Sequence, residues 1–236
     1  MALLSIIQDV TDEIGLPRPE AVISSTDASV RQLLRLANKE GQALARRANW
    51  QRLKKEATFT TTDSHLQTAL STVASDFGKY LNDSMWDRTT DEKVRGPLDE
   101  TQWQALVASP VQAQVGYQFR IWQNGIHFYP APATGVEDDI YFEYMSSHWC
   151  ISAASATQAR WVADTDLGLL DEELMTLGII WRFKKAKGLD YGEEFDDYER
   201  ALETLLGYDG GKETVDFTGQ LTDLFTVNIP EGSWNV

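Results

Sequence analysis

The sequence contains one cysteine, three histidines and few basic residues. Its 236 residues include 21 Lys and Arg against 36 Asp and Glu, a net charge of −15 at pH 7. The single Cys150 excludes a disulfide framework within the chain and a multi-cysteine zinc site. The negative balance argues against general binding to nucleic-acid phosphates or anionic membranes, because both require clustered Lys and Arg.

Long apolar runs and a targeting signal are also missing. No apolar run approaches the ~18 residues of a membrane helix, and no basic region precedes the apolar patch at the start of the chain. We therefore expect no membrane partner and synthesis in a cytoplasm. Eight Trp, eight Tyr and nine Phe exclude disorder as the global state. The length predicts one to two domains with a sizeable core.

Apolar residues at helical spacing occur at both ends of the chain. They predict a helix over residues 3–14, ended by Gly15, and a second helix from the cap candidates at 24–27 to about residue 50. Helical spacing resumes near Leu167 and ends at Gly188. A further helix is expected over residues 191–208, with Asp190 as its N-cap.

The middle of the chain has the pattern of strands. Residues 56–62 and 139–145 are rich in β-branched and aromatic residues, and residues 117–129 alternate around an Asn124-Gly125 turn. Asp99 and Gln102 resemble a capping box. We predict an α+β fold in which residues 1–50 and 164–211 form an antiparallel bundle of about four helices. Residues 51–163 form an inserted β-rich module.

The last segment, residues 212–236, has no helical period but keeps many apolar groups. We interpret it as an extended C-terminal arm that orders against a neighbouring copy or another protein; the alternative is that it folds back on its own core. The apolar residues expected to bind the partner are Phe217, Leu221, Leu224, Phe225, Val227, Ile229 and Trp234.

Charge is unevenly distributed along the chain. Residues 1–163 carry a net charge of −4 and residues 164–236 a net charge of −11, yet Arg46, Arg47 and Arg52 stand close together with Lys54 and Lys55. This basic cluster is either a solvated helix end, where cations suit the helix dipole, or a partner-binding patch.

Catalytic groups are sparse. His65 and His127 have no partner at a fixed spacing, and His148 with Cys150 makes a weak dyad because both are expected on one strand. No P-loop, G-x-S-x-G or H-E-x-x-H motif occurs. We therefore expect no cofactor and a structural role for each histidine.

Two minority interpretations remain from other functional classes. Asp164, Asp166 and Asp171 would suit a metal-dependent hydrolase. We favour the structural alternative, in which Asp164 and Asp166 suit a turn and a cap and Asp171 lies in the first turn of a predicted helix, where the dipole favours acids. The aromatic strands would suit a glycan-binding module, although such strands more often form a β-core. The aromatic residues concerned are Tyr117, Phe119, Trp122, Phe128, Tyr129, Tyr141, Phe142 and Tyr144.

The order of these segments resembles a known family. It is similar to the head-to-tail adaptor, or connector, proteins of short-tailed bacteriophages, the group that includes tail tubular protein A. The resemblance covers about residues 3–198 and departs in the arm. It is carried by DEIGLPRP, STDASVRQLLRLANKEGQALARRANW, SMWDRT, RGPLDETQW, YQFRIWQNGIHFYPAP, DIYFEYMSSHW and ADTDLGLLDEELMTLGIIWRFKKAKGLDY.

The resemblance implies a structural virion protein rather than an enzyme. Family members form a ring, usually of twelve copies, that joins the portal protein to the tail nozzle protein and continues the DNA channel. Viral DNA passes the lumen without specific binding, and the arm often reaches onto the portal. Another neck or tail-completion ring is the alternative within the virion. Acidic groups on the lumen would repel DNA during ejection, which predicts that Asp and Glu from residue 164 onward line the channel.

Overall fold

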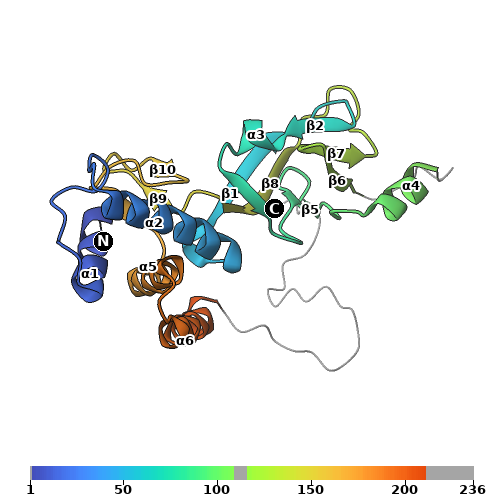
Figure 1. Cartoon of the computed structure of the whole chain (residues 1–236). Helices are drawn as coiled ribbons and strands as arrows, with labels where there is room; N and C mark the ends of the chain where they lie inside the picture. Colours follow the sequence, from blue (N-terminus) through green and yellow to red (C-terminus); the bar gives the residue numbers. More distant parts are fainter. Residues whose placement is uncertain (1, 109–115, 211–236) are drawn as a thin grey trace. The chain divides into compact units, whose positions relative to one another are not determined.

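The computed structural model describes residues 2–108 and 116–210, which form a mixed α+β protein of two compact units (Figure 1). The helical unit comprises residues 2–54 and 146–210, and the β unit comprises residues 55–108 and 116–145. The arm predicted over residues 212–236, with its seven partner-binding residues Phe217, Leu221, Leu224, Phe225, Val227, Ile229 and Trp234, lies outside the described residues.

The two amino-terminal helices of the helical unit begin and end where local chemistry dictates. α1 (Leu3–Ile14) is confirmed and ends at Gly15. The backbone of Gly15 has a φ of 71°, a left-handed conformation that glycine adopts without the steric strain other residues would incur. α2 (Ala28–Arg47) begins at Asp27, whose carboxylate accepts from the N–H groups of Ser29 and Val30. α2 ends three residues earlier than predicted, and a 3-10 turn, η1 (Gln51–Leu53), follows it.

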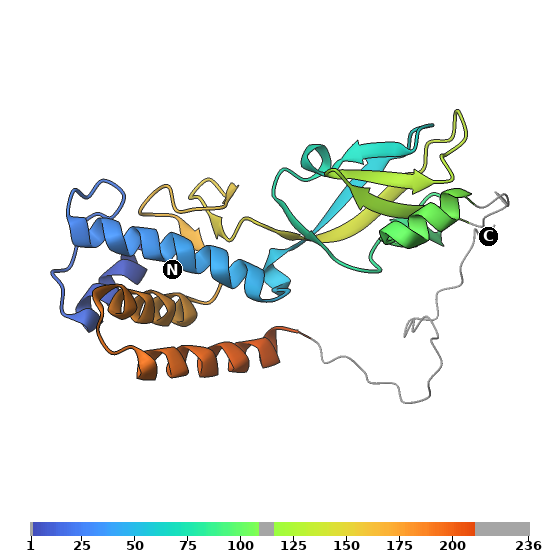
Figure 2. The same ribbon diagram turned by 45° about the vertical axis from the view of Figure 1, so that its right-hand side comes forward.

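The two later helices are α5 (Glu172–Lys187) and α6 (Gly192–Asp209). The expected start of α5 near Leu167 is wrong. Leu167–Gly168 forms a strand, β11, and the helix begins only at its N-cap Asp171. α5 packs against α1, α2 and α6, and Figure 2 shows it lying between α2 and α6. None of the helices in the described ranges is both long and apolar enough to span a membrane.

Residues 146–163 belong to the helical unit, not to the inserted module where we had placed them. Their strands β9 (Cys150–Ile151) and β10 (Thr157–Gln158) form an antiparallel sheet with β11, in the order β10-β9-β11. Trp149 fixes this segment to α2, because a side chain at Gly41 would overlap its indole ring. Trp149 also meets Trp161 edge to face, with ring centroids 5.1 Å apart.

The β unit contains two sheets. The larger runs β1 (Lys54–Thr60), β8 (Asp139–Ser146), β4 (Trp86–Asp87) and β5 (Glu92–Lys93), and β3 (Phe77–Tyr80) also pairs with β8. The smaller runs β2 (Leu66–Ala69), β7 (Gly125–Tyr129) and β6 (Gln118–Trp122). A short helix α3 (Leu70–Val73) follows β2, and α4 (Glu100–Ala108) precedes the hairpin.

The predicted hairpin is present, but its turn lies one residue earlier than expected. Gln123 and Asn124 hold the positive φ angles, 48° and 60°, and Gly125 already pairs with Trp122 as the first residue of β7. A Cβ at Gly125 would come within 2.7 Å of Leu66 Cδ1, the end of an exposed and flexible side chain that can move aside. The capping box is confirmed: Gln102 N–H donates to Asp99 Oδ1 at 2.7 Å, and Asp99 N–H donates to Gln102 Oε1 at 3.2 Å.

The core of the β unit is aromatic and consists of residues of that unit alone. Phe119, Phe128 and Phe142 are fully buried, and Phe142 contacts the rings of Phe59, Tyr80 and Tyr144. The alternating aromatic residues therefore serve mainly as an ordinary β-core. Trp122 is the clear exception, with 49% of its surface exposed.

Candidate interaction surfaces

The basic cluster predicted from sequence lies at the carboxyl end of α2 and in η1. Arg47 forms an ion pair with Glu199 of α6 at 2.5 Å, and nearby the N–H of Gln51 donates to Asp209 of α6 at 2.9 Å. Arg46 and Arg52 are exposed, and no ion pair within residues 2–108 and 116–210 involves either. Arg47 is thus engaged within the helical unit, whereas Arg46 and Arg52 present free charge to solvent.

The three candidate metal-binding carboxylates each cap a different stretch of backbone. Asp164 accepts from the N–H groups of Val22 and Ile23. Asp166, which is buried, accepts from those of residues 162 and 163 at 2.8 Å, and Asp171 caps α5 through the N–H of residue 174. Across the described part of the chain, no group of three or more His, Cys, Asp and Glu is placed to hold a metal ion.

The histidines and the cysteine take separate positions. His65 stacks on Tyr129 in the β unit, with ring centroids 5.7 Å apart. The Cys150 thiol is fully buried and donates to the carbonyl groups of Gln158 and Arg160. Burial, with a smaller contribution from Asp166, raises the pKa of the Cys150 thiol to about 12. Because the thiolate is the reactive form, this cysteine is protected from thiol reagents in the folded state.

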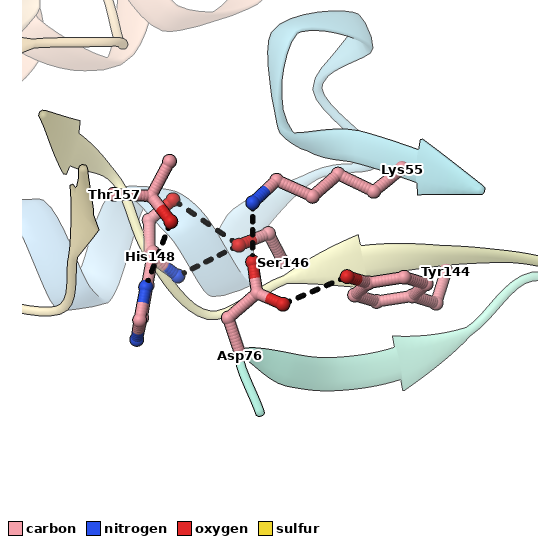
Figure 3. Close-up of polar contacts among 6 residues, drawn as sticks. All are labelled: Lys55, Asp76, Tyr144, Ser146, His148 and Thr157. Atoms are coloured by element: carbon pink, nitrogen blue, oxygen red, sulfur yellow. Dashed lines mark hydrogen bonds and ion pairs between the residues drawn. The ribbon is translucent and has the colours of Figure 1, made fainter. Parts of the chain in front are cut away.

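The expectation that His148 shares a strand with Cys150 is wrong. His148 lies in the loop before β9. Its ring Nδ1 is 3.1 Å from Thr157 Oγ1, and its N–H donates to Ser146 Oγ at 3.0 Å (Figure 3). These contacts hold the loop between β8 and β9, which is a structural role.

A buried polar group holds the start of the larger sheet in the β unit. Asp76 accepts from the Tyr144 hydroxyl at 2.7 Å and forms an ion pair with Lys55 at 2.5 Å, as Figure 3 shows. Burial, followed by the hydrogen bond to Asp76, raises the pKa of Tyr144. Lys55, counted in the basic cluster by sequence, is therefore engaged inside the β unit.

A fully buried carboxylate links three helices of the helical unit, and sequence reasoning missed it. Glu40 of α2 is 0% exposed and forms an ion pair with Arg182 of α5. It also accepts from the Tyr198 hydroxyl of α6 at 2.7 Å. A side chain at Gly178 would overlap Glu40, so α5 must carry glycine where this carboxylate crosses it. The available signal was a charged residue on the apolar face that Ala37, Gly41 and Leu44 share.

The outer face of α6 is acidic. The helix has seven Asp and Glu against one Arg. Glu194 pairs with Lys184, Glu199 with Arg47 and Asp197 with Arg200, and Asp209 accepts from backbone. Glu193, Asp196 and Glu203 are exposed and have no ion-pair partner among the residues that the structure describes. These three residues, called the α6 acidic face below, lie at helical spacing on one side of α6.

An open groove of about 520 Å³ is lined by residues of α1 and α5. Four of its six lining residues are acidic, namely Asp9, Glu13, Glu172 and Glu173, and Thr176 and Leu177 complete it. With this lining the groove disfavours anionic ligands.

A patch with little charge, exposed at Leu66 and Trp122 and half-buried at its other two residues, lies on the β2-β7-β6 sheet. It consists of Leu66, Arg120, Trp122 and His127, which we call the hairpin-tip patch. Leu66 is 52% exposed and pairs with His127, whose ring centroid is 5.4 Å from that of Trp122. Burial, and the nearby Arg120, lower the pKa of His127, so Arg120 carries the only charge of the patch at neutral pH.

No protein-family model matches the chain, and a search of curated proteins likewise finds no match.

Proposed function

We propose that this protein is a structural virion component, a ring-forming connector that joins a portal to a tail nozzle and continues the DNA channel. The observation that carries the proposal is the order of elements: two helices, an inserted β unit, and two further helices with α5 at the centre. The quoted sequence segments follow the same order. In this proposal the four helices form the antiparallel bundle of one ring subunit.

The direct test is the mass of the chain, alone and mixed with its cognate portal ring, by light scattering across size exclusion. Co-elution at the mass of the portal plus several copies, twelve for the family's usual ring, is the expected result. A folded, intact portal that leaves the chain unbound contradicts the proposal and favours another neck ring.

The C-terminal arm supplies part of the portal contact in this proposal. Ordering a chain of this kind costs conformational entropy, which burial of apolar groups offsets on binding. Phe217, Leu221, Leu224, Phe225, Val227, Ile229 and Trp234 are the residues we assign to that contact.

In this proposal the basic cluster supplies the second contact with the portal, through Arg46 and Arg52. Replacing both by Glu is expected to weaken portal binding by roughly tenfold or more, since each reversal turns a favourable charge contact into a repulsive one. Arg47 is left unchanged because it holds Glu199 within the helical unit. Portal co-sedimentation measures the effect.

The matched control is reversal of Arg31 and Arg35, two exposed arginines on the same helix. It makes the same change in net charge and should leave portal binding near the wild-type level. If both double variants lose portal binding equally, only net charge matters. If both keep wild-type portal binding, Arg46 and Arg52 are merely solvated.

The α6 acidic face lines the channel in this proposal and repels the DNA backbone. Replacing Glu193, Asp196 and Glu203 by Lys is expected to slow DNA release from assembled particles by roughly tenfold, because the wall would then attract phosphates. The effect should shrink as salt is raised.

Its control replaces Glu20, Glu137 and Glu143 by Lys, three exposed acids outside α6. Both triple variants change the net charge by the same amount, so a difference in release rate isolates position from charge. Equal release rates in the two variants would place the α6 acidic face outside the channel.

A further inference from the structure

One long stretch of the chain is almost free of charge. Charged residues make up 24% of the sequence, yet Arg120 is the only one between Thr101 and Val136. Within the described residues, this stretch supplies α4 after its first residue, the hairpin β6–β7 and the loop after it. Part of this stretch is core, with Phe119, Ile126 and Phe128 fully buried, so the inference concerns only those of its residues that remain exposed.

The helix α4 is only partly covered, since Trp103 and Leu106 are half-buried and Val107 is exposed. It has nine residues and none of them is buried, and Val107 is 46% exposed. Trp103 makes one ring contact, with Tyr129 at 6.3 Å. A helix this short is marginal in water and gains its stability from packing of an apolar face, which the described part of its own chain provides only in part.

The hairpin-tip patch is a second uncovered surface of the same unit. Trp122 of β6 and Leu66 of β2 lie on the two strands that flank β7, where Trp122 pairs with Gly125 and Leu66 with His127. The guanidinium of Arg120 lies 5.8 Å from the Trp122 ring centroid. The Arg120 side chain is itself only 15% exposed and forms an ion pair with Glu100 at 3.7 Å, so Trp122 is the exposed anchor of the patch, and tryptophan is among the residue types that contribute most to protein interfaces.

We propose that these two surfaces meet between copies: the apolar side of α4 on one chain covers the hairpin-tip patch of the next. This inference rests on the proposed function, which requires a ring of copies. Each copy carries −15, so copies repel one another on average, and a surface where charge is nearly absent adds least to that repulsion. A basic partner would instead be drawn to the acidic surfaces.

The contact is heterologous, because two different surfaces of one chain meet. A heterologous contact repeats from copy to copy and closes into a ring when the rotation allows it. The same arrangement buries Val107 and Trp122 together, with the polar side chains of Gln104 and Gln123 at the rim.

The test uses the full chain without other proteins. Sedimentation up to about 200 μM should show concentration-dependent association, and higher salt should strengthen it because screening weakens the repulsion between copies. Trp122→Glu and Val107→Glu should each weaken association by about tenfold or more, since each buries an unpaired charge. Leu189→Glu, at a residue 56% exposed in the helical unit, is the control and should associate like the wild type.

A mixing experiment tests the pairing of the two surfaces. Trp122→Lys and Val107→Glu chains should each stay monomeric, because each lacks one of the two surfaces. An equimolar mixture should form heterodimers, because the unchanged α4 of the Trp122→Lys chain can still cover the unchanged patch of the Val107→Glu chain. Thermal unfolding of each variant checks that it is folded. A wild-type chain that stays monomeric throughout, or variants that associate like the wild type, would overturn the inference.

Portal binding separates this inference from the proposed function. Patch variants that no longer self-associate but still bind the portal, at reduced copy number, leave both proposals standing. If the wild-type chain self-associates through these two surfaces but does not bind the portal, the connector proposal is overturned and this inference stands. Portal binding at full copy number by the patch variants removes the inference alone.

Discussion

Replacing Glu40 by Ala is expected to lower the free energy of unfolding of the helical unit by about 3–5 kcal/mol, enough to unfold many domains of this size. The variant leaves the Arg182 guanidinium without its carboxylate in a site only 16% exposed. It also removes the acceptor of the Tyr198 hydroxyl. Removing one partner of a buried pair is costly because the remaining charge stays desolvated.

Urea denaturation followed by the far-ultraviolet helical signal measures this loss. Lys39→Ala is the matched control, since Lys39 is the exposed neighbour of Glu40 on α2, and it should change stability by no more than about 0.5 kcal/mol. If Glu40→Ala lowers the free energy of unfolding no more than the control does, Glu40 and Arg182 do not form the buried ion pair described above.

A triple variant separates charge burial from packing. Glu40→Leu with Arg182→Met and Tyr198→Phe removes all three polar groups together. Apolar replacement of a whole buried ionic group is often neutral or stabilising, so the triple variant should recover most of the stability lost in Glu40→Ala.

Burial and the neighbouring Glu40 raise the pKa of Tyr198, so this hydroxyl stays protonated near neutral pH.

Helix ends were predictable because the groups that fix them are local in sequence. Asp27 caps α2, and Gly15 and Gly188 adopt the left-handed conformation at the ends of α1 and α5. Asp171, expected in the first turn of a helix, is instead the N-cap of α5.

The errors arose where distant residues decide the structure. β9, β10 and β11 have two residues each, too few for a periodic pattern, and they pair across gaps that sequence spacing does not reveal. Residues 146–163 consequently looked like part of the β module. The start of α5 was placed too early because the apolar Leu167 fits a helical stripe as well as a strand.

The candidate surfaces show the same division. Clustering of Arg46, Arg47 and Arg52 was visible in the sequence, but the ion pair of Arg47 with Glu199 joins residues 152 positions apart. Exposure of Trp122 was equally hidden, because strand alternation assigns it to a face without saying whether anything covers that face.

Replacing Phe142 by Ala is expected to destabilise the β unit by about 3–5 kcal/mol and to leave the helical unit folded. Phe142 is fully buried, and its ring contacts those of Phe59, Tyr80 and Tyr144. Its removal leaves a cavity in a core formed by residues of the β unit alone. Glu143→Ala, at the exposed next residue of β8, is the control.

Two readouts distinguish the units in one sample. Hydrogen exchange of the peptides covering β6, β7 and β8 reports the β unit, and labelling of the thiol at Cys150 reports the helical unit. Because burial raises the pKa of Cys150 to about 12, labelling at pH 8 requires this unit to open. Phe142→Ala should accelerate exchange in the three strands at urea concentrations where Cys150 stays protected. Labelling of Cys150 at the same urea concentration would mean that the two units unfold as one.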